Sequence, residues 1–178
     1  MASIQNYLIL SAIGLNRPDI ISELSRACWQ CGCNLLNTNS NLLGEDLAVV
    51  MFLSGNWGAI AKMETALPSL EQKLGLSIQA RRTQEPSVTG QSMPYTIQVI
   101  AIDRTGILTE ISDFLLGHSV QTEELSSHTY VTHPGTRMAS LHFKINIPEK
   151  VHLATLREEF IAYCDDKNLE GFIEPLRP

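Results

Sequence analysis

The chain has 178 residues, of which 44% are hydrophobic and 18% charged, as in an ordinary folded protein. Its net charge of −6 argues against direct nucleic-acid binding, because phosphate contacts need clustered Lys and Arg. The longest unbroken apolar run, Leu47–Leu53, is far shorter than the roughly 20 residues of a membrane span. The sequence also opens without a basic, apolar leader. We therefore expect a cytoplasmic protein that contacts neither nucleic acid nor a membrane.

The first half predicts the order β-α-β-β-α-β. An apolar stretch over residues 7–13 predicts a strand, and a helical stripe follows, formed by Ile20, Ile21, Leu24, Ala27 and Cys28. A strand from Cys33, a turn at Gly44 and a strand over Leu47–Leu53 come next. A second helical stripe is formed by Ile60, Met63, Leu67, Leu70 and Leu74. Pro68 predicts a kink or break in that helix, and residues 76–82 predict the closing strand.

The second half repeats this order. A strand over Tyr95–Ile102 precedes a helical stripe formed by Ile107, Leu108, Ile111, Phe114 and Leu115. A strand from Val120, a turn at Pro134-Gly135 and a strand over Met138–Ile147 follow. The last of these alternates apolar and polar residues, which predicts a sheet covered on one face only. The second helix has a stripe formed by Leu153, Leu156, Phe160 and Tyr163, and residues 169–176 close the half.

Placing Arg17 on Arg104 aligns the two halves, so the chain reads as a duplication. The order predicts an α+β protein with two ferredoxin-like βαββαβ modules, each an antiparallel sheet with both helices on one face. We expect modules over residues 1–82 and 94–178, joined by a Pro-, Gly- and Ser-containing linker over 83–93. Modules of this size hide their apolar surface poorly, so pairing of modules, including a homo-oligomer, is expected.

Cysteine and histidine give little support for a metal or cofactor. Cys28, Cys31 and Cys33 form a C-x2-C-x-C pattern, but no second C-x2-C pair completes a tetrahedral site. Burial as small apolar residues is the favoured interpretation. His128 and His142 lie on two strands of one predicted hairpin, yet spacing places no third ligand beside them. We expect no metal and no cofactor, and we expect the two tryptophans to be packing residues.

Two segments of the first half carry a family resemblance. Asn16-Arg17-Pro18-Asp19-Ile20 resembles the N-R-P-G-hydrophobic turn of ACT domains, and Cys31-Gly32-Cys33-Asn34-Leu35 resembles their G-x-N-I segment. In order and spacing, essentially the whole chain resembles a tandem ACT-domain protein. The resemblance implies an accessory transcriptional regulator of glycine-cleavage genes that senses an amino acid, with glycine expected. It also implies that a LysR-type activator is the partner and supplies the DNA contact.

A ligand site is expected where the first strand of a module meets its first helix. Backbone N–H groups at a helix N-terminus favour a carboxylate, and an Asn side chain can both donate and accept hydrogen bonds. The resemblance implies that the turn and the G-x-N-I segment face a ligand at a domain–domain interface. The corresponding residues are Asn16 and Asn34 in the first copy, and Asp103 and Gln121 in the second.

The two turns depart from the family pattern in different ways. Asp19 stands where the family has glycine, and its carboxylate would repel that of a ligand. The second copy keeps Gly106 but has Thr105 in place of proline. A composite site that combines Gly106 with Asn34 would use the open turn of the second copy and the asparagine of the first.

Other interpretations stay open. Asn16, Asp19 and Asp103 are equally compatible with helix capping, and Arg17 and Arg104 with surface charges. No catalytic motif is present, so we expect no enzyme. Acylphosphatases share the ferredoxin-like topology, and Arg17 with Asn41 would have to serve in such an enzyme, although the flanking residues do not fit. An ACT-type regulatory subunit of an amino-acid metabolic enzyme is the other alternative.

Overall fold

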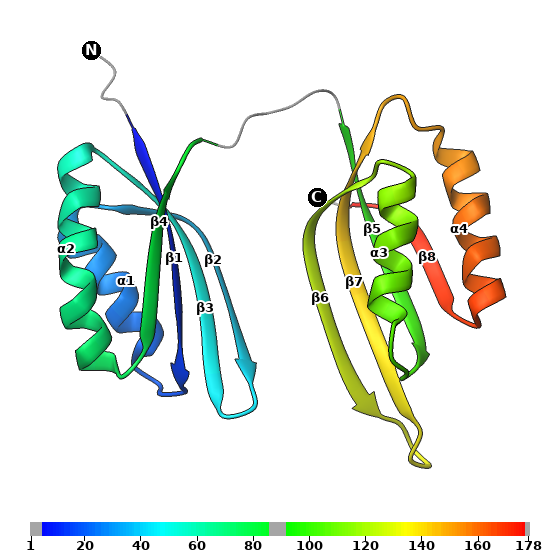
Figure 1. The fold of residues 1–178 in the computed structure, drawn as a ribbon, viewed down its shortest axis with the longest axis horizontal. Helices are drawn as coiled ribbons and strands as arrows, with labels where there is room; N and C mark the ends of the chain where they lie inside the picture. Colours follow the sequence, from blue (N-terminus) through cyan, green and yellow to red (C-terminus); the bar gives the residue numbers. More distant parts are fainter. Residues whose placement is uncertain (1–4, 86–91, 177–178) are drawn as a thin grey trace. The chain divides into compact units, whose positions relative to one another are not determined.

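The computed structural model describes residues 5–85 and 92–176, which form two compact units (Figure 1). The first unit contains β1 (Asn6–Leu15), α1 (Ile20–Cys31), β2 (Asn34–Leu43), β3 (Asp46–Gly55), α2 (Trp57–Leu74) and β4 (Ser77–Thr83). The second contains β5 (Ser92–Ile102), α3 (Ile107–Gly117), β6 (Gln121–Val131), β7 (Arg137–Pro148), α4 (Leu153–Lys167) and β8 (Glu170–Pro175). β4 and β5 extend slightly into the expected linker, of which residues 86–91 lie outside the described residues.

Each unit is a four-stranded sheet in which every neighbouring pair of strands is antiparallel. The strand orders are β2-β3-β1-β4 and β6-β7-β5-β8. Both helices of a unit cover the same face of its sheet (Figure 1). The α+β, ferredoxin-like prediction is therefore confirmed. None of the helices in the described ranges is both long and apolar enough to cross a membrane.

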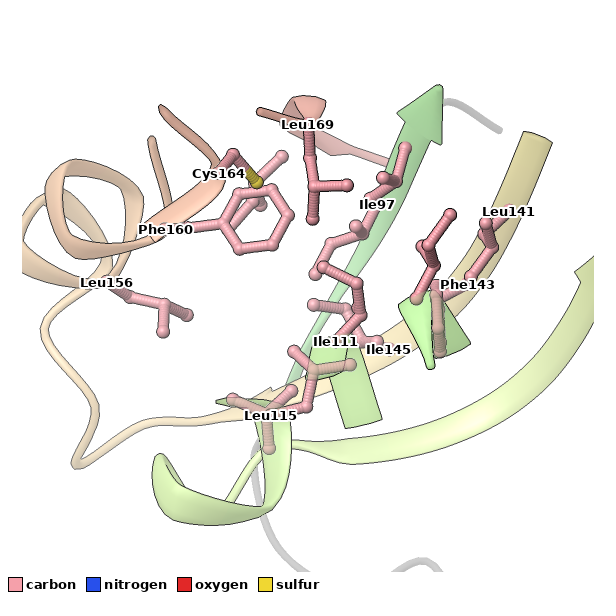
Figure 2. Close-up of a cluster of buried hydrophobic side chains, with 14 of the residues drawn as sticks. Ile97, Ile111, Leu115, Leu141, Phe143, Ile145, Leu156, Phe160, Cys164 and Leu169 are labelled. Atoms are coloured by element: carbon pink, nitrogen blue, oxygen red, sulfur yellow. The ribbon is translucent and has the colours of Figure 1, made fainter. Parts of the chain in front are cut away.

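The covered face of each sheet carries the core. In β7, Leu141, Phe143 and Ile145 are buried while His142 between them is exposed, which confirms the predicted alternation. Figure 2 shows these side chains meeting the helices, which contribute Ile111, Leu115, Leu156, Phe160 and Cys164. Each large apolar side chain buried in this way stabilises the fold by roughly 1.5–3 kcal/mol before the entropy cost of ordering it.

Pro68 does not break α2, so of the predicted kink or break the break is wrong. The helix runs continuously from Trp57 to Leu74. Proline removes one backbone donor from a helix, but Pro68 lies on the exposed side, where water can solvate the carbonyl that loses its partner. The buried positions Met63, Leu70 and Leu74 on the other side keep the helix packed on the sheet.

A β-bulge interrupts the second strand of each unit near its start. The register of β2 against β3 shifts between Leu35 and Asn37, and that of β6 against β7 shifts between Thr122 and Glu124. A bulge adds one residue to a strand and so changes which face the following side chains occupy. As a result, Asn34 shares the open face of the sheet with Asn37, although an even alternation would separate them.

The cysteines and tryptophans differ in exposure. Cys28 is 1% exposed, and burial raises the pKa of its thiol to about 12. Cys33 is also buried, whereas Cys31 is half-buried. Trp29 and Trp57 are 76% and 65% exposed, so neither is packed within its own unit as expected. Each lies on the exposed surface of its helix, and the residue type alone does not predict that exposure.

Candidate functional site

The turn between β5 and α3 is open and requires glycine. Gly106 is the N-cap residue of α3 and has a φ of 94°, a left-handed conformation that residues with a Cβ rarely adopt. A Cβ built there meets nothing within 4 Å, so the backbone conformation rather than a lack of space selects glycine. The Asp103 N–H donates to the Arg137 carbonyl over 3.0 Å, which holds the turn against the β6–β7 hairpin.

A pocket of about 360 Å³ lies at this turn. Its walls are the turn itself and the neighbouring parts of β6 and β7, and the residues include Asp103, Arg104, Gly106, Ser127, His128, Thr129 and Ala139. Ser127 pairs with Leu141 and Thr129 with Ala139, and both partners are buried toward the helices. The two hydroxyl-bearing side chains therefore lie on the helical side of the sheet, beside the free N–H groups of α3.

The guanidinium group of Arg104 places a positive charge at the rim of this pocket. Its guanidinium donates to both carboxylate oxygens of Glu110, over 2.9 and 2.7 Å, and to the Lys167 carbonyl at the end of α4 over 3.5 Å. These bonds lower the pKa of Glu110 and raise that of Arg104. Arg104 thus connects the turn to α4 of its own unit. Its interpretation as a simple surface charge did not include this contact.

The corresponding turn in the first unit is occupied by an ion pair. Asp19 takes the place of Gly106, and both of its carboxylate oxygens accept from Arg17. The hydrogen bonds with Arg17 are the main cause that lowers the pKa of Asp19. Arg17 also donates to the Leu74 carbonyl over 3.3 Å, as Arg104 does at the end of α4. The Asp19 side chain makes no capping bond to α1, so helix capping by that carboxylate is not observed.

The Asn and Gln positions of the expected site lie far from the turns of their own units. Asn34 is opposite Ser54, which pairs with Tyr7 near the start of β1, whereas Asn16 follows the end of that strand. Gln121 stands in the same relation to Asp103 in the second unit. At about 3.3 Å per residue, either pair is separated by roughly 30 Å along the sheet. A single unit cannot bring both to one small ligand.

The structure thus places the seven expected residues in different settings. Asp103 and Gly106 line the pocket, while Thr105 is exposed in the same turn and is not among the lining residues. Asn16 is exposed, and its N–H donates to the Glu45 carbonyl over 2.9 Å, which ties the first turn to its hairpin.

Ser127 and Thr129 were not predicted. Their recognition requires the register of β6 on β7, which the bulge near Glu123 alters. The only signal in the sequence is the small residue Ala139 on the neighbouring strand, which leaves room for the pocket.

Two residue pairs considered from the sequence remain, His128 with His142 and Arg17 with Asn41. The rings of His128 and His142 lie parallel, 6.4 Å apart, on the open face of the second sheet. Within residues 5–85 and 92–176, no three His, Cys, Asp or Glu side chains come together in a way that could hold a metal ion. Arg17 bonds to the end of α2 on the helical side, whereas Asn41 is exposed in register with Ala48 on the open face. The residue pair required of an acylphosphatase is therefore separated.

Comparison with known proteins agrees with the fold. Residues 6–81 match the family model described as the ACT domain. The chain is 31% identical over 173 residues to the glycine cleavage system transcriptional repressor of Escherichia coli (strain K12), with 96% of this chain and 90% of the relative covered. The same values hold for the protein of that name from Shigella flexneri. A crystal structure described as that of such a repressor superimposes with a TM-score of 0.76 at 24% identity, covering 99% of this chain and 100% of the other.

Proposed function

Because the chain belongs to the ACT-domain family of glycine cleavage system transcriptional repressors, we propose that it is a regulator of glycine-cleavage genes that senses an amino acid. We propose glycine as the ligand and a LysR-type activator in the cytoplasm as the partner. The net charge of −6 supports a regulator that leaves DNA contact to its partner. The observation that carries the proposal is the pocket at the Gly106 turn.

The pocket supplies groups that suit a small amino acid. The unpaired N–H groups at the start of α3 favour the ligand carboxylate. The carboxylate of Asp103 and the hydroxyl oxygens of Ser127 and Thr129 are acceptors for its ammonium group. The absence of a side chain at Gly106 leaves the backbone accessible. In the first unit the Arg17–Asp19 pair occupies this place, so the second unit is the sensing one.

The expected site also includes residues outside this pocket. Asn34 and Gln121 lie on open sheet faces, roughly 30 Å from their own turns by the strand rise. They take part only in a composite site, with the turn supplied by one module and the second strand by another. Asn34 is the residue expected to join a site built on Gly106 and Thr105 of the second turn. Asn16 and Asp19 belong to the corresponding turn of the first unit.

Titration calorimetry with glycine tests the site. Gly106→Asp places a carboxylate in the turn and is expected to abolish binding, while Gly117→Asp, at the other end of α3, is the matched control. Asn34→Ala is expected to weaken binding about tenfold if the composite site forms, the effect of one lost hydrogen bond to a charged group. Asp19→Gly opens the first turn and is expected to add a second binding event. Binding that Gly106→Asp and Asn34→Ala both leave unchanged contradicts this site.

Co-purification tests the partner. The wild-type chain is expected to retain a LysR-type activator on a column and to release it when glycine is added. Gly106→Asp should retain the activator but no longer respond to glycine. Direct binding of the isolated chain to promoter DNA, with no activator retained, contradicts the proposed mode of action.

A further inference from the structure

A groove runs along the outer side of the helical layer in the first unit. It encloses about 390 Å³ and is lined by Glu23, Arg26, Ala27, Gln30, Ala66, Ser69, Leu70 and Lys73. Arg26 and Lys73 both pair with the single carboxylate of Glu23. The groove therefore has one more positive than negative charge, within a chain whose net charge is −6.

The second unit is filled and acidic at the same place. Phe114 and Tyr163 stand at the positions of Ala27 and Leu70, their rings are 5.1 Å apart, and the Tyr163 hydroxyl donates to the Glu110 carbonyl over 3.2 Å. Two large side chains thus close the gap that the smaller pair leaves open in the first unit.

The charges of the two helical surfaces are reversed. Asp113 of α3 stands at the position of Arg26, and Asp166 of α4 at the position of Lys73. Asp113 is exposed and makes no side-chain hydrogen bond or ion pair with any residue in the described ranges. Among the residues that the structure describes, Asp166 forms an ion pair with Lys167 alone, over 3.3 Å, and its side chain is 74% exposed.

An exposed apolar side chain accompanies each surface. Trp29 follows Arg26 by one helical turn and is 76% exposed, and Leu116 follows Asp113 by one turn and is 75% exposed. α1 therefore presents a cation followed by an aromatic ring, and α3 presents an anion followed by an aliphatic side chain. Large, exposed apolar residues beside complementary charges are typical of protein interfaces.

We propose that the α1–α2 surface of one copy docks onto the α3–α4 surface of a second copy of this chain. Arg26 and Lys73 then face Asp113 and Asp166 of the second copy, with Trp29 against Leu116. Two like surfaces would bring like charges together, which costs binding energy, so the unlike surfaces pair. Each chain carries one surface of each kind, and two copies can satisfy both contacts reciprocally in a closed dimer.

Analytical ultracentrifugation of charge-reversed chains tests the proposal. The wild type is expected to dimerise, with an affinity that falls as salt is added. Arg26→Asp with Lys73→Asp should weaken the dimer at least tenfold, as should Asp113→Lys with Asp166→Lys, because each double change creates like-charge contacts. All four changes in one chain should restore the affinity to within about threefold of the wild type, since the pairs are then exchanged. Circular dichroism of each variant checks that it is folded.

Tryptophan variants separate the proposed contact at Trp29 of α1 from the rest of the helical layer. Trp29→Ala should weaken the dimer about tenfold, as expected of a buried interface aromatic residue. Trp57→Ala removes a ring at the start of α2 that is 65% exposed and is not part of the proposed contact, and the affinity should stay unchanged. A chain that is monomeric at every concentration, a dimer insensitive to the charge reversals, or four combined changes that fail to restore it each overturn the proposal.

Discussion

Gly171 of β8 leaves no room for a side chain, and its replacement by alanine should destabilise the second unit. A Cβ at this position would lie 2.5 Å from the Cys164 sulfur and 2.9 Å from the nearest Phe160 ring carbon. The optimal separation of such non-bonded atoms is about 3.5 Å or more, so the Cys164 sulfur would have to move away from the new Cβ by about 1 Å. Cys164 and Phe160 are 2% and 0% exposed, so neither can turn toward solvent. Overpacking of this kind costs about 1–3 kcal/mol.

Chemical denaturation monitored by far-UV circular dichroism measures this cost. Gly171→Ala should lower the free energy of unfolding of the second unit by about 2 kcal/mol. Gly117→Ala is the control, since a Cβ there meets nothing within 4 Å and the backbone is not left-handed. Its effect should stay within about 0.5 kcal/mol.

A double-mutant cycle identifies the clash. Cys164→Ala removes the nearest atom, so Gly171→Ala should cost about 1 kcal/mol less in that background, the coupling expected of residues in contact. The Phe160 ring remains in place, which is why recovery is incomplete. Equal costs of Gly171→Ala with and without the Cys164 sulfur would refute this account of the packing, as would a neutral Gly171→Ala.

Two further predictions concern titration and reactivity. His118 joins α3 to α4: a hydrogen bond with the Phe114 carbonyl and a contact of 2.7 Å to Glu159 raise its pKa. Its contribution to stability is therefore present below the ordinary pKa of 6.5 and is lost as pH rises through the raised value. His118→Gln should cost about 0.5 kcal/mol more at pH 5.5 than at pH 8 for a partly exposed group, and equal costs in thermal denaturation would contradict the sign. Iodoacetamide at pH 8 should label native Cys31 but not Cys28, whose thiol is buried with a pKa of about 12; peptide mass spectrometry showing equal labelling would contradict that burial.

Most of the fold was predictable because apolar periodicity reports directly on burial. The stripe from Ile20 to Cys28 marks the face of α1 that is buried, although Ile21 within it is 40% exposed, and the alternation in β7 marks the buried strand positions. Pro68 lies within an unbroken helix because the packing of α2 on the sheet overrides the low helix propensity of proline, and that packing is not visible in the local sequence. Exposure on a helix surface depends on what covers it, so Trp29 could not be assigned from the sequence.

The candidate site was predictable only in part. The turn and Gly106 followed from the helix start, which is local in sequence. Ser127 and Thr129 come from a strand whose pairing with β7 is set by a bulge, and nothing local to either residue indicates it. The separation of Asn34 from Asn16 likewise depends on strand direction rather than on either residue type.

The two bulges also bear on the ancestry of the chain. Each follows the second residue of its strand, after Leu35 in β2 and after Thr122 in β6. A matching irregularity at matching places is most simply inherited from the single module that was duplicated. The difference between Asp19 and Gly106 belongs to the period after duplication, when the copies diverged. The shape of the second strand is thus older than the difference in sequence between the two turns.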